Sequence, residues 1–255
     1  MTRGTDNRTR RTFSFLKVLE FIPLAPQIVK FLYKVKTPAL KLSCLGLDFK
    51  HPVGIAAGID RKGEYFHLMD NYGPSFIEIG PLHDVAPAIS NIQKNTPETL
   101  IFANLSNAED LERSFSLIYD FVDAIVLNVS DNTRVAFVID RLVTLRRYSD
   151  EYRPVLFRIS PDISDANLKE SVHYVLASGL DGIEVPASKV KVVKELSDGI
   201  VPVIACDEFK DMAQLQQALD DGASLVALKN SPTHYGPAYI KKVLKYLNRK
   251  DRQQQ

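Results

Sequence analysis

Polar and charged side chains stand directly after several short apolar runs of this 255-residue chain. Arg61 follows the apolar run 52–58, Asn128 follows the run 123–127, and Arg158 and Lys229 follow two later runs. Arginine and lysine bind carboxylates and phosphates, and arginine does so through paired hydrogen bonds. A neutral amide offers both a donor and an acceptor, which suits the edge of a heterocycle. These residue types predict a site for a small organic ligand that carries negative charge.

Other chemistries find less support in the residue types. Cys206 also follows an apolar run, but Asp207 and Glu208 come next and no histidine is near, so we expect a packed cysteine and no nucleophile. The other cysteine, Cys44, is distant in sequence, and the five histidines form no HxxxH or HxH pair, which argues against a metal site. The net charge of +1 gives no reason to expect a nucleic acid partner.

The elements that position these residues alternate between short apolar runs and helical periods, which is typical of βα units. We expect strands near 52–57, 75–79, 99–104, 123–128, 155–159, 181–185, 201–205 and 223–228. Helices are expected near 62–72, 106–121, 132–147, 165–178, 188–197, 210–220 and 234–248. Eight such units in about 250 residues predict an α/β fold, a (β/α)8 TIM barrel, whose ligands bind at the carboxyl ends of the strands.

Local signals mark the ends of some helices. Ser106 before Glu109 and Asp211 before Gln214 have capping-box spacing, and two glycines, Gly179 and Gly222, stand where helices end. The connection 80–98 between the second and third expected strands has room for only a short helix near 88–94. The barrel wall is therefore expected to be thin there.

A separate element precedes the barrel, so the domains are expected to be 1–40 and 41–255. Residues 2–11 are polar and rich in arginine, and two amphipathic segments follow, broken by Pro23 and Pro26. This helical hairpin either lies on an anionic membrane surface, since lysines accompany its apolar side, or docks on the barrel. No segment approaches the roughly 20 apolar residues of a spanning helix.

Five stretches of the sequence together resemble the dihydroorotate dehydrogenase family. They are GLDFKHPVGIAAGIDRKGE at 46–64, FIEIG at 76–80, VLNVS at 126–130, RPVLFRISPD at 153–162 and DGASLV at 221–226. The resemblance implies a barrel that binds FMN, takes a hydride from dihydroorotate and, in the quinone-using class, passes electrons to quinone. The leading hairpin is similar to that of the membrane-associated class, which implies a cytoplasmic protein, peripheral on the cytoplasmic face of the membrane.

The resemblance also implies roles for residues at the strand ends. Ala56, Ala57 and Gly58 match the strand end that lies against the flavin, and Asn104 and Asn128 match asparagines that bond flavin or substrate. The alternative for each asparagine is a contact that satisfies the backbone of a loop.

Two arginines stand where the family has lysines. Arg61 replaces the lysine that meets the carboxylate of the substrate, and Arg158 replaces the lysine near N1 of the flavin. A fixed positive charge at Arg158 would favour an anionic reduced flavin. The alternative is that Arg158 pairs with an inward carboxylate after the ligand has been lost.

The catalytic loop departs from the family's Ser-Pro-Asn-Thr, because this chain reads Ser130, Asp131, Asn132 and Thr133. Asp131 stands at the position of the base, next to Ser130, and Asn132 matches an asparagine that contacts the substrate. A carboxylate in an apolar pocket can act as a base. Asp131 also has the position of a helix N-cap, and that reading stays open.

Two further departures weigh against the family's chemistry. The segment that holds the pyrimidine has no clear counterpart in 80–98, and the glycines that bind the FMN phosphate are replaced by Cys206, Asp207 and Glu208. Lys229 could offset part of the repulsion from a phosphate. Two readings follow: an FMN-dependent oxidoreductase of the dihydroorotate dehydrogenase type, or a non-catalytic barrel that binds a partner, serves as a scaffold or holds another small anion.

Overall fold

The computed structural model describes residues 30–33, 35–106, 110–128, 132–230, 235–236 and 238–254, with side chains described for all of these except 132–138 and 254. The basic lead, most of the helical hairpin and the expected positions of Ser130 and Asp131 lie outside the described residues. Among the described residues, no helix is long and apolar enough to cross a membrane.

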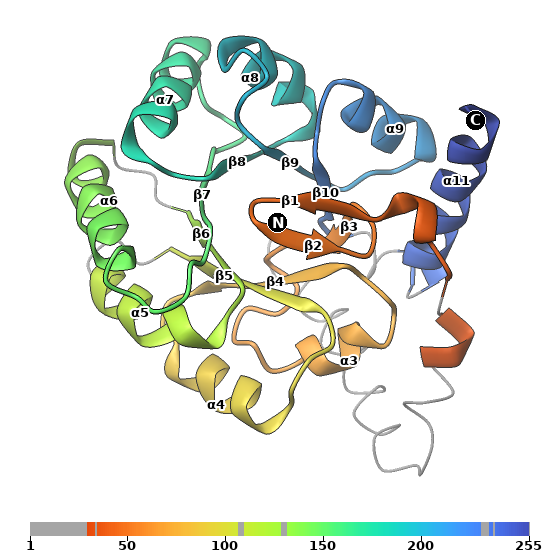
Figure 1. The fold of residues 1–255 in the computed structure, drawn as a ribbon, viewed down its shortest axis with the longest axis horizontal. Coiled ribbons are helices and arrows are strands. Elements are labelled where there is room, and N and C mark those ends of the chain that lie inside the picture. Colours follow the sequence, from red (N-terminus) through yellow and green to blue (C-terminus); the bar gives the residue numbers. More distant parts are fainter. Residues whose placement is uncertain are drawn as a thin grey trace.

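Eight parallel strands close into a barrel, with helices packed around it (Figure 1). The strands are β3 (Val53–Ile55), β4 (Phe76–Leu82), β5 (Leu100–Leu105), β6 (Ala124–Leu127), β7 (Val155–Arg158), β8 (Gly182–Val185), β9 (Val203–Asp207) and β10 (Leu225–Leu228). Strand β10 pairs with both β9 and β3, which closes the ring. The expected (β/α)8 barrel is confirmed, and each strand lies at one of the expected apolar runs.

Helices follow the strands in the order that the periodicity predicts. They are α3 (Phe66–Asp70), α4 (Ala86–Lys94), α5 (Leu111–Ile118), α6 (Asn132–Arg146), α7 (Asp165–Ser178), α8 (Val190–Leu196), α9 (Met212–Asp220) and α11 (Ala238–Gln254), with short 3-10 turns η1 (Pro38–Leu40), η3 (Tyr119–Phe121) and η4 (Ala187–Lys189). Helix α4 is the only one of these between β4 and β5, as expected for the short connection there.

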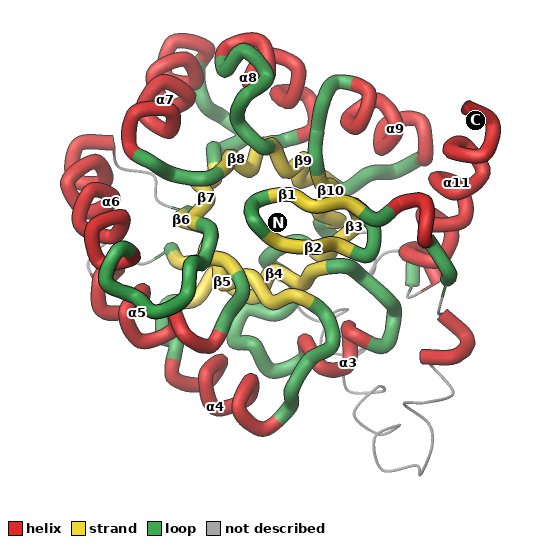
Figure 2. The backbone as a smooth tube through the Cα atoms, viewed as in Figure 1, coloured by secondary structure: helices red, strands yellow, loops and turns green. Residues whose placement is uncertain are grey.

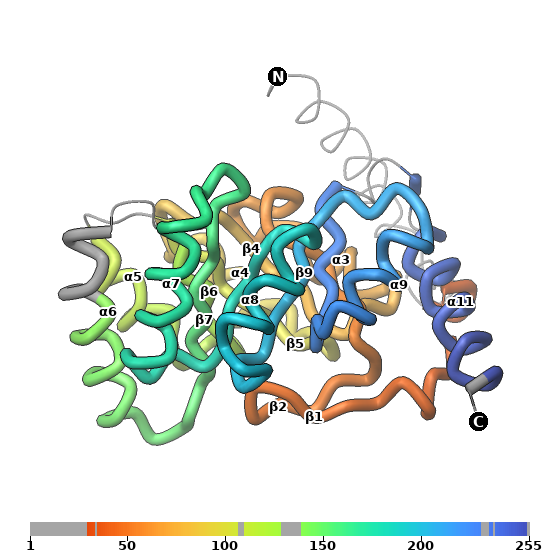
Figure 3. Tube along the Cα trace, turned by 90° about the horizontal axis from the view of Figure 1, so that it is seen from above, coloured from red at the N-terminus to blue at the C-terminus, as the bar shows by residue number. Residues whose placement is uncertain are grey.

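A two-stranded hairpin that the sequence analysis did not predict precedes the barrel. Strands β1 (Leu42–Cys44) and β2 (Leu47–Phe49) pair antiparallel, and Figures 2 and 3 show the hairpin lying across one end of the barrel. Leu45 and Phe49 are buried in the same cluster as the barrel interior. Because Phe49 packs against Phe76 and Phe102, near the starts of β4 and β5, the hairpin closes the amino-terminal end.

The lower interior of the barrel is apolar and tightly packed. Phe76 and Phe102 stack with ring centroids 4.9 Å apart. A Cβ atom added to Gly54 would lie 2.4 Å from the ring of Phe76, so only glycine fits opposite that ring. The bulky rings leave no room for a ligand at this depth, so any site in the barrel lies closer to the carboxyl ends of the strands.

Three of the four helix-end signals are confirmed. Asp211 caps α9 by accepting a hydrogen bond from the backbone of Gln214 at 2.9 Å, and Gly179 and Gly222 adopt positive φ values of 78° and 103° just after α7 and α9. The prediction that Ser106 starts a helix stays a prediction, because α5 begins at Leu111 and residues 107–109 lie outside the described residues.

The described end of the N-terminal hairpin contacts the barrel and also exposes apolar side chains. The Tyr33 ring meets the edge of Tyr72 at 5.4 Å, and the backbone oxygen of Leu32 accepts a hydrogen bond from Lys241 of α11. Phe31 is nevertheless 82% exposed and Leu32 53% exposed. This segment therefore docks by one side and presents an apolar side to the solvent.

Candidate functional site

A layer of polar side chains covers the apolar interior at the carboxyl ends of the strands. Alternate residues of a strand face the same side, so a residue two positions after one that faces the barrel interior also faces the interior. Each polar residue of the layer follows an interior residue of its strand in this way. The pairs are Phe76 and Glu78, Phe102 and Asn104, Leu156 and Arg158, Gly182 and Glu184, and Ile204 and Cys206. The layer faces the end of a barrel at which ligands bind.

Arg158 is the centre of this layer. Its Nη1 atom lies 3.0 Å from Oε1 of Glu184 and 3.5 Å from Oε1 of Glu78. Its Nη2 atom donates to the sulfur of Cys206 at 3.6 Å. Both glutamate side chains are 1% exposed, whereas the arginine side chain is 15% exposed. The guanidinium group is therefore shared between two buried carboxylates.

A hydrogen-bonded chain links this ion cluster to the asparagines predicted from the sequence. Asn128 donates to Oδ1 of Asn104 at 3.2 Å, and Asn104 donates to Oε1 of Glu78. The other oxygen of Glu78 accepts from the backbone N–H of Ala57 at 2.9 Å. Glu78 is thus the shared partner of Asn104, Ala57 and Arg158, and Asn128 joins them through Asn104.

Burial dominates the protonation of two groups in the cluster. Burial raises the pKa of Glu184 to about 8, and the neighbouring Glu78 adds to this, while the Arg158 guanidinium opposes it. Burial and the Glu184 carboxyl raise the pKa of the Cys206 thiol, which keeps it protonated. Cys206 is accordingly a packed, protonated thiol whose neighbouring carboxyl groups disfavour the thiolate.

The loop after β3 is held by a buried carboxylate. Asp60 is 1% exposed and accepts hydrogen bonds from the backbone N–H groups of Glu64 at 2.8 Å and Tyr65 at 2.7 Å. The helix expected from residue 62 therefore begins only at Phe66. Gly58 donates its N–H to the backbone oxygen of Gly80 at 2.7 Å. The loop presents Arg61 as an exposed side chain.

The end of β9 and the loop after it carry two carboxylates, Asp207 and Glu208, where the resemblance places phosphate-binding glycines. The backbone N–H of Glu208 donates to the Asp207 carboxylate at 2.7 Å, so it does not point at an open anion site. The backbone N–H of Lys229, which follows β10, donates to the backbone oxygen of Asp207 at 2.8 Å. This arrangement does not suit a phosphate dianion, because the N–H groups of Glu208 and Lys229 are bonded within the protein and two carboxylates stand at the position of the glycines.

Three predicted site residues cannot be placed. Ser130 and Asp131 lie outside the described residues, and Asn132 is described only as the first residue of α6. Among the residues that the structure describes, no group of three or more side chains could hold a metal ion.

The sequence analysis missed Glu184 and gave Glu78 no role. A signal for both was present, because each is a single carboxylate within an otherwise apolar strand, in FIEIG and in GIEV. Carboxylates are seldom fully buried unless they are paired. An acid that interrupts an apolar run should therefore be matched with a cation at the same level of a neighbouring strand.

Relatives with curated names match this chain over most of its length, although no known family's sequence profile matches it. The dihydroorotate dehydrogenase (quinone) of Christiangramia forsetii is 24% identical, with 91% of each chain covered. That of Wigglesworthia glossinidia brevipalpis is also 24% identical, with 90% of this chain and 93% of the relative covered. The alignment with the first spans 310 positions, against 255 residues here, so the relative has segments that this chain lacks.

The fold agrees with these matches. A crystal structure of DHODH from Eimeria tenella in complex with ferulenol superposes with a TM-score of 0.76 at 17% identity, and covers 88% of this chain and 90% of that chain. A ligand-free structure of the same protein gives the same score at 18% identity. The curated relatives make this chain similar in sequence to dihydroorotate dehydrogenases over about nine tenths of its length, and the solved structures show that it shares their barrel fold.

Proposed function

We propose that this chain has kept the barrel of the dihydroorotate dehydrogenase family but lost FMN-dependent oxidation of dihydroorotate, and that it acts as a non-catalytic binding or scaffolding protein. The observation that carries the proposal is the pairing of Arg158 with Glu78 and Glu184. The three ionised groups sum to a single negative charge, and with Glu184 protonated they sum to zero. Neither state supplies the net positive charge that would favour an anionic reduced flavin.

The loop after β9 supports the same conclusion. A carboxylate about 4 Å from a phosphate charge costs about 4 kcal/mol at an effective dielectric constant of about 20. Micromolar binding releases only about 8 kcal/mol in total. Asp207 and Glu208 together would therefore remove much of the affinity for FMN, even after partial compensation by Lys229.

The family reaction is the second candidate, and one observation favours it. Ala57, Gly58, Asn104 and Asn128 stand at the carboxyl ends of β3, β5 and β6, where the resemblance places contacts to flavin and substrate. In this reading Arg61 and Asn132 hold the substrate, and Ser130 or Asp131 accepts the proton. The electrons would pass from the flavin to a quinone.

The purified protein is expected to be colourless and to show no uptake of added FMN in a visible absorption titration. A matched variant, Asp207→Gly with Glu208→Gly, is expected to take up added FMN in the same titration, because it removes both carboxylates from the phosphate loop. Tight FMN uptake by the natural protein, followed by turnover of dihydroorotate with a quinone analogue, would establish the second candidate instead.

We also propose that the N-terminal hairpin attaches the protein to an anionic membrane surface, which would make the chain a peripheral protein. The exposed Phe31 and Leu32 support this. The full chain is expected to float with vesicles that contain anionic lipid, and the variant Phe31→Ser with Leu32→Ser is expected to lose most of this binding. Exposed Tyr148, also apolar but remote in sequence, supplies the control Tyr148→Ser. Equal flotation of all three proteins would reject the membrane role of these residues.

A further inference from the structure

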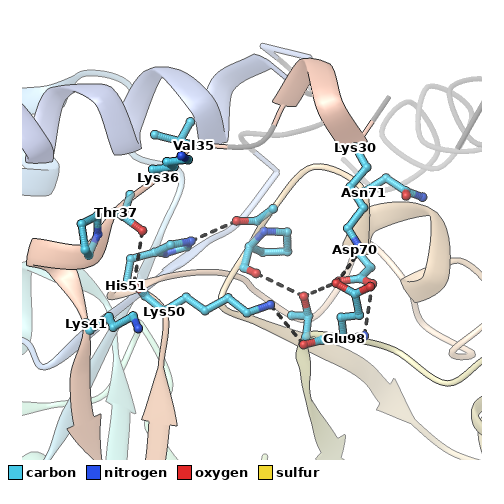
Figure 4. Close-up of a pocket in the computed structure, with 14 residues that line it drawn as sticks. Lys30, Val35, Lys36, Thr37, Lys41, Lys50, His51, Asp70, Asn71 and Glu98 are labelled. Carbon is cyan, nitrogen blue, oxygen red and sulfur yellow. Dashed lines mark hydrogen bonds and ion pairs between the residues drawn. The ribbon is translucent and has the colours of Figure 1, made fainter. Parts of the chain in front are cut away.

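A cavity lies at the opposite end of the barrel from the polar layer. It has a volume of about 490 Å³, within the range of small-molecule sites. His51 precedes β3, Pro74 precedes β4 and Thr99 precedes β5, so the cavity opens at the amino-terminal end of the strands (Figure 4). Ligand sites of such barrels lie at the other end, so this cavity is separate from the candidate site above.

The lining of the cavity carries a positive charge in excess. Four lysines line it, against two carboxylates: Lys30, Lys36, Lys41 and Lys50, with Asp70 and Glu98. Burial lowers the pKa of His51 to about 4, so this ring is neutral at pH 7. The lining therefore has an excess of about two positive charges.

The two carboxylates differ in their partners. Glu98 forms an ion pair with Lys30 at 2.5 Å, and its backbone oxygen accepts from Nζ of Lys50 at 3.2 Å. Asp70 accepts from the hydroxyl of Thr99 and from the backbone N–H of Glu98. Glu98 is thus paired with Lys30, whereas both donors to Asp70 are neutral groups, so one carboxylate remains against Lys36, Lys41 and Lys50.

Lys36 and Lys41 form one wall, across the cavity from Asp70 and Glu98 in Figure 4. Val35, Pro38 and Pro74 supply apolar surface beside them. The segment that carries the two lysines is fixed in place, since the backbone oxygen of Lys36 accepts from Asn248 of α11 at 3.1 Å. The cavity thus pairs an apolar surface with two cations on an anchored backbone.

We propose that this cavity binds a small organic dianion, with a phosphate-type head on Lys36 and Lys41 and an apolar body against Val35 and the prolines. Two lysines suit a compact doubly charged head, because each ammonium group acts as a point charge. The volume accommodates a whole small molecule, head and body together. The proposal does not depend on whether the other end of the barrel binds FMN.

Phenyl phosphate is the probe for calorimetric titration of the full chain at low ionic strength. We expect it to bind, and to bind more tightly than benzoate, which has a similar body and only one negative charge. The variant Lys36→Gln with Lys41→Gln is expected to weaken binding of phenyl phosphate at least tenfold. Lys169→Gln with Lys191→Gln is the matched control, because it removes the same charge from exposed positions on α7 and α8, and it is expected to bind within about twofold of the natural protein.

Thermal unfolding of all proteins shows whether the variants fold, and the exposed Lys41→Glu gives an independent charge reversal that should abolish binding. Absence of binding by the natural protein, equal losses in the two double variants, or tighter binding of benzoate than of phenyl phosphate would each overturn the proposal.

Discussion

Replacement of Arg158 by methionine is expected to lower the free energy of unfolding by about 3–5 kcal/mol, because it leaves buried carboxylates without a cation. Methionine keeps the length of the side chain and much of its volume, so the loss of charge dominates the effect. Glu78 and Glu184 are both 1% exposed and cannot recover their hydration without opening the barrel. Urea unfolding at pH 7, followed by fluorescence or circular dichroism, measures the change.

The matched control is Arg141→Met. Arg141 pairs with Glu112 at 3.0 Å, but its side chain is 57% exposed, so the expected loss is below about 1 kcal/mol. The triple variant Arg158→Met, Glu78→Gln and Glu184→Gln removes the whole ion cluster and should recover part of the stability, since buried ion pairs add little net stability over neutral groups. If Arg158→Met lowers the free energy of unfolding by no more than Arg141→Met does, the two glutamates are not held as a charged cluster.

The distribution of predicted and unpredicted features has a physical origin. Eight strands were predictable because parallel barrel strands are buried on both faces and appear as continuous apolar runs. Caps such as Asp211 were predictable because the contact is local, between a side chain and a backbone group three residues away. The hairpin β1–β2 was missed because strands of three residues show no periodicity.

The candidate site was only partly predictable for a different reason. Asn104, Asn128 and Arg158 could be picked out because polar residues after apolar runs are local signals. Their partners depend on the closed barrel, which brings β4, β7 and β8 to a common centre although Glu78 and Glu184 are over 100 residues apart in sequence. Ion pairing across a barrel is a property of closure and has no local pattern.

Stability is expected to fall as the pH rises through neutrality, and Glu184 is the expected cause. In the unfolded chain this carboxyl has its ordinary pKa of 4.5, whereas burial raises the folded-state pKa to about 8. Between these values the folded protein binds more protons than the unfolded chain does. The free energy of unfolding therefore decreases with pH, by at most about 1.4 kcal/mol per unit from this group.

Glu184→Gln removes the titrating group and keeps its shape. Urea unfolding at pH 5.5, 7 and 8.5 is expected to show that the free energy of unfolding depends less on pH in the variant. The free energy of unfolding of the variant, relative to that of the natural protein, should therefore rise by about 2–4 kcal/mol across this range. Glu170→Gln, at an exposed position on α7, is the control, and its free energy of unfolding should change with pH as that of the natural protein does. Parallel curves for Glu184→Gln as well would mean that attraction to Arg158 outweighs burial and keeps Glu184 ionised. In that case the cluster would carry a permanent negative charge, which would oppose an anionic flavin even more strongly.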